Sequence, residues 1–269
     1  MGADKAPVAH LSPARRSAER RPAPRDQRSA GRRVLDGIRE FVIIVVVALL
    51  VSTLLKTFVL QMFIIPSQSM ESTLEINDRV VAMKVVKYER GDIIVFEDKM
   101  DWLPPAPAPS PVQKVLEFVG VLPAAGDQYL VKRLIGLPGD HVVCCSKTGK
   151  ITVNGVEIDE SSYLYTNPDG TKVKPSEMDF DVVVPAGRVF VLGDHRNKSA
   201  DSRYHLCDTS AGTKGLGAFP AITSIQGPVR ATGFPFSRAR TFSVPSTFAS
   251  IPAATAAPPA APQITAANC

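Results

Sequence analysis

The chain lacks the cysteine spacing typical of metal and redox centres. Its four cysteines are Cys144, Cys145, Cys207 and Cys269, and none of them forms a C-x-x-C pair. Zinc and dithiol sites usually need that spacing, so we expect no metal and no cofactor. Adjacent strand residues point to opposite faces, so Cys144 or Cys145 would face away from the core. Two alternatives stay open: a Cys145–Cys207 disulfide, or buried free thiols.

The residues after the N-terminal region also lack an excess of basic side chains, although the net charge of the chain is +5. Residues 1–40 contain ten Lys and Arg against five Asp and Glu, whereas residues 66–269 contain twenty against twenty-one. Nucleic-acid-binding domains usually carry a basic patch, so we expect no nucleic-acid partner. The excess lies in residues 1–33, whose Arg-, Ala-, Pro- and Ser-rich composition predicts a disordered basic tail.

Charge is absent from a long run, Phe41 to Leu55, and after Lys56 the chain stays apolar to Ile65. As a helix, residues 41–65 would be about 37 Å long, and a bilayer core is about 30 Å thick. A cleaved signal peptide would have a shorter lead, and a buried core helix would show a polar stripe. We therefore predict a single membrane anchor over residues 34–65. The basic flank places the N-terminus in the cytoplasm and the rest of the chain outside the cell membrane.

Beyond the anchor the pattern predicts an all-β domain over residues 66–236. Short Val- and Ile-rich runs alternate with turn signals, among them Asn154-Gly155, a strong hairpin signal. The predicted strands are Arg79–Val86, Asp92–Phe96, Tyr129–Ile135, His141–Cys144, Ile151–Val153 and Arg188–Leu192. Residues 104–111 form a Pro-rich loop, and residues 237–269 are a tail, Ala- and Pro-rich from Pro245, with too few large residues to form a core.

Two residues suggest hydrolytic chemistry when they are taken together. Ser69 follows the anchor in the segment Pro66-Ser-Gln-Ser-Met70, and Lys132 sits inside an apolar strand. Separately, each is ordinary, as a loop serine or a solvated lysine. A buried lysine, however, can lose about 2 to 3 units of its reference pKa of about 10.4, which corresponds to about 3 to 4 kcal/mol. A neutral Lys132 amine could then take the proton of an attacking Ser69 hydroxyl.

A third segment, Phe190 to Tyr204, runs from a strand into a polar loop that contains acids, arginines and hydroxyls able to orient a buried amine. The chain resembles the bacterial type I signal peptidase (leader peptidase) family over residues 34–236. The resemblance lies in the order and sequence of four segments: those around Ser69 and Lys132, Tyr88 to Phe96, and Phe190 to Tyr204. The resemblance implies an antiparallel all-β catalytic domain with one N-terminal transmembrane helix. It also implies a serine endopeptidase that removes signal peptides from exported preproteins after Ala-x-Ala-like sites.

The resemblance assigns roles to residues that match the family's motifs. P-S-x-S-M implies Ser69 as nucleophile, with the Ser67 hydroxyl and the Ser69 N–H as oxyanion donors. Y-x-x-K-R implies Lys132 as general base and Arg133 as its structural neighbour. The third motif implies that Ser199 orients the lysine amine and that Asp201 and Arg203 hold the loop by an ion pair. Positions 195, 197 and 198 depart from the usual pattern of that loop.

The resemblance also implies a set of apolar residues that wall shallow pockets for small substrate side chains, or that are ordinary core or membrane-facing surface. They are Phe63, Ile65, Met70, Leu74 and Val131. Signal-peptide-bearing preproteins and the lipid bilayer are the expected partners, and no oligomer is indicated.

Three alternatives compete with a Ser/Lys peptidase. A Ser/His/Asp hydrolase would use His141, His195 or His205, but the chain has no G-x-S-x-G motif and nothing places a histidine beside Ser69. A metal site of His195, His205 and Cys207 fits no usual zinc spacing. A non-catalytic, membrane-anchored β-domain that binds exported partners would not need Ser67, Ser69, Lys132 and Ser199 in family order.

Overall fold

The computed structural model describes residues 30–104, 110–112, 128–210 and 212–267. Most of the predicted basic tail, residues 105–109 of the Pro-rich loop, and Cys269 lie outside the described residues. The chain divides into two compact units, residues 1–47 and residues 48–269, and every strand of the described residues lies in the second unit.

Helix α1 spans Ala30–Phe58, so residues 30–33 are helical and not part of a disordered tail. Its segment Val34–Leu55 is long and apolar enough to cross a membrane, at about 33 Å for 22 residues. Apolar side chains along it, Phe41 among them, are exposed, which disfavours the core-helix alternative.

The expectation that the helix continues to Ile65 is wrong. Leu60–Ile64 forms strand β1, which pairs antiparallel with β2 (Arg79–Met83). The side chains of β1 alternate, with Phe63 buried and Met62 and Ile64 exposed. A short apolar run does not by itself distinguish helix from strand, and the partner strand that decides it lies fifteen or more residues further along.

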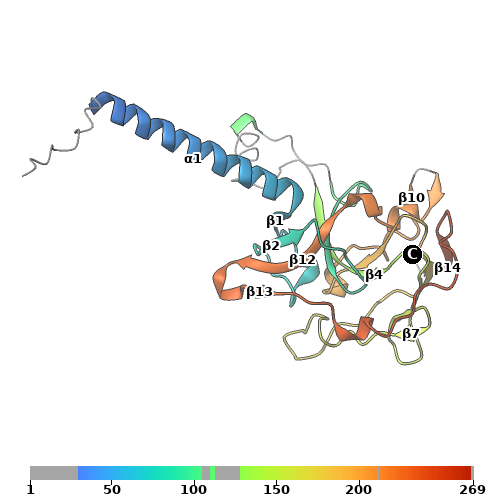
Figure 1. Ribbon diagram of the computed structural model, residues 1–269. Coiled ribbons are helices and arrows are strands. Elements are labelled where there is room, and N and C mark those ends of the chain that lie inside the picture. Colours follow the sequence, from blue (N-terminus) through green and yellow to red (C-terminus); the bar gives the residue numbers. More distant parts are fainter. Residues whose placement is uncertain (1–29, 105–109, 113–127, 211, 268–269) are drawn as a thin grey trace, which may run out of the picture. The chain divides into compact units, whose positions relative to one another are not determined.

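A seven-stranded sheet holds the body together (Figure 1). Its order is β1-β2-β12-β3-β4-β9, and β13 pairs with β12. The remaining bounds are β12 Ile225–Phe234, β3 Ile93–Glu97, β4 Tyr129–Gly136, β9 Phe190–Leu192 and β13 Arg240–Thr241. Every registered pair is antiparallel, which confirms the predicted fold class.

A five-stranded antiparallel sheet has the order β14-β8-β5-β6-β7. Its strands are β14 Gln263–Ala267, β8 Phe180–Val183, β5 His141–Cys144, β6 Thr152–Val153 and β7 Val156–Glu157. Asn154 and Gly155 join β6 to β7 with φ of 52° and 80°, the left-handed pair that a tight hairpin turn requires. A small ribbon, β10 (Thr209–Ser210) with β11 (Thr213–Lys214), completes the strands of the described residues.

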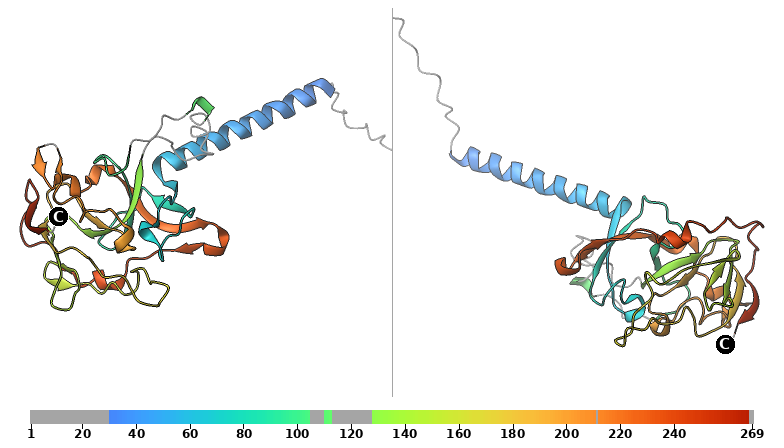
Figure 2. Two further views of the ribbon diagram at one scale, coloured as in Figure 1. Left: turned by 180° about the vertical axis from the view of Figure 1, so that it is seen from behind. Right: turned by 90° about the horizontal axis from the view of Figure 1, so that it is seen from below.

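The residues after Pro245 form no core of their own, but they pack against the rest of the β-rich domain. Phe248 and Ile251 are buried in the same apolar cluster as Tyr163, Phe190 and Phe219. The segment ends in β14, which pairs with β8 and forms one edge of the five-stranded sheet. Figure 2 follows this segment in red across the body.

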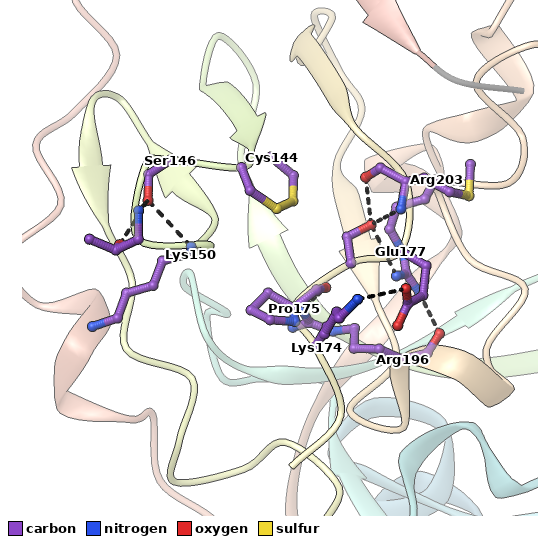
Figure 3. Close-up of a disulfide and its surroundings, with 12 residues drawn as sticks. Cys144, Ser146, Lys150, Lys174, Pro175, Glu177, Arg196 and Arg203 are labelled. Carbon is purple, nitrogen blue, oxygen red and sulfur yellow. Dashed lines mark hydrogen bonds and ion pairs between the residues drawn. A yellow bond between two sulfur atoms is a disulfide. The ribbon is translucent and has the colours of Figure 1, made fainter. Parts of the chain in front are cut away.

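The cysteines are arranged differently from either sequence alternative. Cys144, at the end of β5, is disulfide-bonded to the adjacent Cys145 (Figure 3). The Cys145–Cys207 disulfide is therefore wrong, and so is the free-thiol alternative for Cys144 and Cys145. Simple strand alternation does not apply here because β5 ends at Cys144.

Candidate active site

Strand β4 carries the candidate base into the interior. It lies between β3 and β9, and its residues from Val131 to Gly136 are all buried. Lys132 is only 3% exposed and stands opposite Ile94 of β3. The solvated-lysine alternative is therefore wrong, because this central strand has no wet face at residue 132.

The candidate nucleophile lies on a short turn that follows the edge strand β1. The 3₁₀ helix η1 (Gln68–Met70) presents Ser69, which is buried. Lys132 Nζ lies 2.6 Å from Ser69 Oγ, within hydrogen-bonding distance, and Ser67 Oγ lies 3.3 Å from the same Ser69 oxygen. Two residues 63 positions apart in the sequence thus form a direct hydroxyl–amine pair.

Burial lowers the pKa of Lys132 from 10.5 to about 8. Loss of solvation disfavours the charged ammonium and is the largest cause. Asp201 and Asp194 act in the opposite direction, while Arg203 lowers the pKa further. The surroundings therefore favour an amine that loses its proton near neutral pH, as a general base needs to do.

Asp194 connects the segments that carry the serine and the lysine. Its carboxylate accepts two hydrogen bonds from Arg133, at 2.8 Å and 2.6 Å, and one from Thr73 Oγ1 at 2.6 Å. Arg133 directly follows Lys132, and Thr73 lies four residues after Ser69. Because all three side chains are buried, this network fixes β4 against the turn after η1.

The next residue, His195, holds the turn itself. Its backbone N–H donates to the Ser69 carbonyl at 3.0 Å. Its ring nitrogen Nδ1 lies 2.7 Å from Glu71 Oε2, and the ring stacks on Tyr165 at 3.7 Å between centroids. His195 therefore contacts the backbone of Ser69 and not its hydroxyl, unlike the base of a Ser/His/Asp hydrolase.

The third predicted segment surrounds Gly193. A Cβ at residue 193 would collide with the Ser199 side chain and with the Ser69 carbonyl oxygen, so both groups lie against this glycine. Asp201 accepts from the Gly193 N–H at 3.0 Å and pairs with Arg203 at 2.8 Å. Ser199 Oγ is buried and has no hydrogen-bond partner among the described residues, so the predicted contact with Lys132 is not formed in this structure.

The five predicted pocket residues lie together. Phe63, Ile65, Met70, Leu74 and Val131 belong to one cluster of buried side chains, none more than 8% exposed. They are therefore not a membrane-facing surface. Since Met70 adjoins Ser69 and Val131 adjoins Lys132, the cluster lies next to the hydroxyl–amine pair. Their role as pocket walls stays a prediction.

Several supporting residues were missed from the sequence. Tyr163 lies under the Arg133 guanidinium at 4.0 Å, and its hydroxyl donates to Glu160 at 2.7 Å. Glu160 also pairs with Arg196, whose Nε donates to the Gly193 carbonyl at 2.9 Å. Figure 3 shows Arg196 near Pro175 and Arg203. No local pattern marks Tyr163 or Glu160, because the arginines that they contact lie about thirty or more residues away.

The site therefore combines a buried hydroxyl, Ser69 Oγ, with a desolvated amine, Lys132 Nζ, the pair that a Ser/Lys hydrolase would need. The chain matches the family model of signal peptidase, peptidase S26, over residues 38–231. It is 34% identical over 223 residues to a signal peptidase I of Mycobacterium tuberculosis, with 75% of this chain and 74% of that one covered. It is 32% identical over 202 residues to signal peptidase I P of Bacillus subtilis subsp. natto, covering 73% and 88%.

A solved signal peptidase I from Enterococcus faecalis V583 is 25% identical and covers 54% of this chain and 97% of its own, with a TM-score of 0.30. By the family match and the curated relatives, the chain belongs to the signal peptidase I family of serine-type peptidases.

Proposed function

We propose that the chain cleaves signal peptides from exported preproteins with Ser69 as nucleophile and Lys132 as general base. The observation that carries the proposal is the 2.6 Å distance between Lys132 Nζ and Ser69 Oγ in a site where both residues are buried. An amine with a pKa of about 8 is partly neutral at physiological pH, so it can accept the serine proton without a histidine.

The reaction begins when Ser69 Oγ attacks the scissile carbonyl carbon and its proton moves to Lys132 Nζ. The Ser67 hydroxyl and the Ser69 N–H stabilise the negative oxygen that develops on the tetrahedral intermediate. As the C–N bond breaks, the Lys132 ammonium returns its proton to the leaving amine and an acyl-Ser69 ester remains. A water molecule, deprotonated by Lys132, then attacks the ester carbonyl carbon. As the bond to Ser69 Oγ breaks, the Lys132 ammonium gives its proton to that oxygen, which restores the Ser69 hydroxyl and the neutral amine.

The anchor accounts for how substrate and enzyme meet. Val34–Leu55 is long enough to cross the bilayer once, and nine Lys and Arg residues precede it. We place the N-terminus in the cytoplasm and the β-rich body outside, by the positive-inside rule. Ser69 follows Leu55 by fourteen residues, so the site works near the outer membrane surface, where a preprotein's signal peptide is delivered.

The test is the processing of a purified preprotein with an Ala-x-Ala site by the full chain in detergent micelles. Mass spectrometry should find one cut after the second alanine. Ser69→Ala and Lys132→Ala should each abolish it, while the exposed control Lys174→Ala should cut at the wild-type rate. Full processing by Lys132→Ala would refute the dyad, and no processing by the wild type would refute the function.

A further inference from the structure

The segment after β13 is anchored to the body along its length, although it lies beyond the family-matched residues 38–231. Thr247 Oγ1 accepts from the Asp159 N–H at 2.7 Å. The Pro252 carbonyl accepts from Asn154 Nδ2 at 2.9 Å, and the Pro259 carbonyl accepts from the Ala186 N–H at 2.8 Å. Figure 1 shows this segment in red, from β13 to β14. It therefore has a fixed course over the body.

One side chain of this segment, Phe248, contacts the surroundings of the candidate base. The ring is 5% exposed and packs on Gly91, where a Cβ would collide with the ring carbons. Gly91 also has a φ of +88°, which a residue with a side chain adopts at a steric cost. The Phe248 ring also stacks on Tyr163, at 6.2 Å between centroids and 23° between planes. Phe248 thus contacts two residues that are far apart in sequence.

Both residues that Phe248 contacts also contact Arg133. The Gly91 carbonyl accepts from Arg133 Nη1 at 2.6 Å, and the Tyr163 ring lies 4.0 Å from the guanidinium carbon. The remaining guanidinium nitrogens, Nε and Nη2, donate to Asp194. Arg133 directly follows Lys132 on β4. A displacement of the Arg133 side chain would therefore also shift the backbone that positions Lys132, the candidate base.

We propose that Phe248 is a positioning residue for catalysis, which holds Arg133 through Gly91 and Tyr163 and thereby keeps Lys132 and Asp194 in place. The inference rests on the proposed function, since it concerns the same base. Without the ring, Gly91 and Tyr163 gain freedom and the Arg133–Asp194 contact loosens. A misplacement of about 1 Å at a reacting group can lower a rate about a hundredfold, so we expect kcat to fall by about tenfold or more.

The loosened contact has an electrostatic signature. Lys132 is surrounded by Asp194 and Asp201, which raise its pKa, and by Arg203, which lowers it. An Asp194 carboxylate that is less well neutralised by Arg133 raises the Lys132 pKa further. The acid limb, which is the part of the kcat/KM profile that rises with pH, should therefore move to higher pH when Phe248 is replaced by a smaller residue. A purely structural role would change the melting temperature and leave the limb in place.

The experiment compares Phe248→Ala with Ile251→Ala in the full chain. Ile251 lies three residues further on, is buried in the same cluster, and is the matched control for a truncated tail residue. We expect Phe248→Ala to lower kcat with little change in KM and to shift the acid limb upward, whereas Ile251→Ala keeps the wild-type limb. Equal profiles for the two folded variants would overturn the proposal.

Phe248→Leu covers the case in which Phe248→Ala does not fold. It keeps most of the apolar volume but removes the aromatic contact with Tyr163, so kcat should fall and the limb should shift in a protein with near-native melting. A wild-type profile for Phe248→Leu would overturn the proposal. Loss of processing in the wild type itself would instead refute the proposed function, so the two failures are distinguishable.

Discussion

The pH dependence of cleavage follows from the burial of Lys132. Only its neutral form can accept the Ser69 proton, so kcat/KM should rise with pH and level off above its pKa of about 8. With that pKa about a tenth of the amine is neutral at pH 7, whereas a solvated lysine with a pKa of about 10.4 would be neutral in fewer than about one molecule in a thousand. The shift corresponds to about 3 kcal/mol against the charged form.

The assay is an internally quenched peptide with an Ala-x-Ala site, cleaved by the full chain in detergent micelles from about pH 5.5 to pH 10. The peptide should contain no group that titrates in this range. His141→Asn and His205→Asn serve as controls, and neither should move the acid limb. The ordinary pKa of histidine is about 6.5. An acid limb with its midpoint at that pH, shifted by a histidine substitution, would refute Lys132 as the base.

Three further outcomes test individual residues. Ser67→Ala should lower kcat about a hundredfold with KM nearly unchanged, as loss of an oxyanion donor does; an equal rise of KM would contradict that role. Ser199→Ala should lower kcat without lowering the melting temperature, because its hydroxyl has no partner among the described residues; a lower melting temperature with wild-type kcat would contradict the orienting role. Lys132→Met should be more stable than wild type below pH 8, by up to about 3 kcal/mol. The pKa of Lys132 is lower in the folded chain than in the unfolded chain, so the unfolded chain binds more protons between pH 8 and about 10.4. The free energy of unfolding of the wild type should therefore rise with pH in that range and approach that of Lys132→Met. Urea unfolding at several pH values measures this difference, and a difference that stays constant with pH would contradict the burial of a charge.

Much of the body could be predicted from local patterns. The Val- and Ile-rich runs gave most of the central strands, and Asn154-Gly155 gave its hairpin, because period-two burial and turn chemistry are local properties. Ser69 and Lys132 could be proposed from their neighbours and motif order. Their 2.6 Å contact depends on β1 and β4 lying in one sheet, which no local pattern indicates.

The features that the sequence did not predict have a common physical cause. Each depends on contacts with residues that are distant in the sequence. Leu60–Ile64 is apolar enough to extend the helix, but pairing with β2 makes it a strand. Phe248 is a lone aromatic in an Ala- and Pro-rich segment, so it has no periodic signal, and its burial depends on Gly91 and Tyr163. Asp194 shows in the sequence only as one acid in a polar loop, although it connects Arg133 to Thr73.

The most direct test of the dyad is whether Ser69 and Lys132 act as one unit. Processing rates of Ser69→Ala, Lys132→Ala and the double variant should be measured with one preprotein at about pH 9, where the wild type is fully active. Residues that act together are strongly non-additive, so all three variants should show the same residual rate, at least about a thousandfold below wild type. If Lys132→Ala keeps activity that the second substitution then removes, Ser69 has another base and the Ser69–Lys132 dyad is refuted.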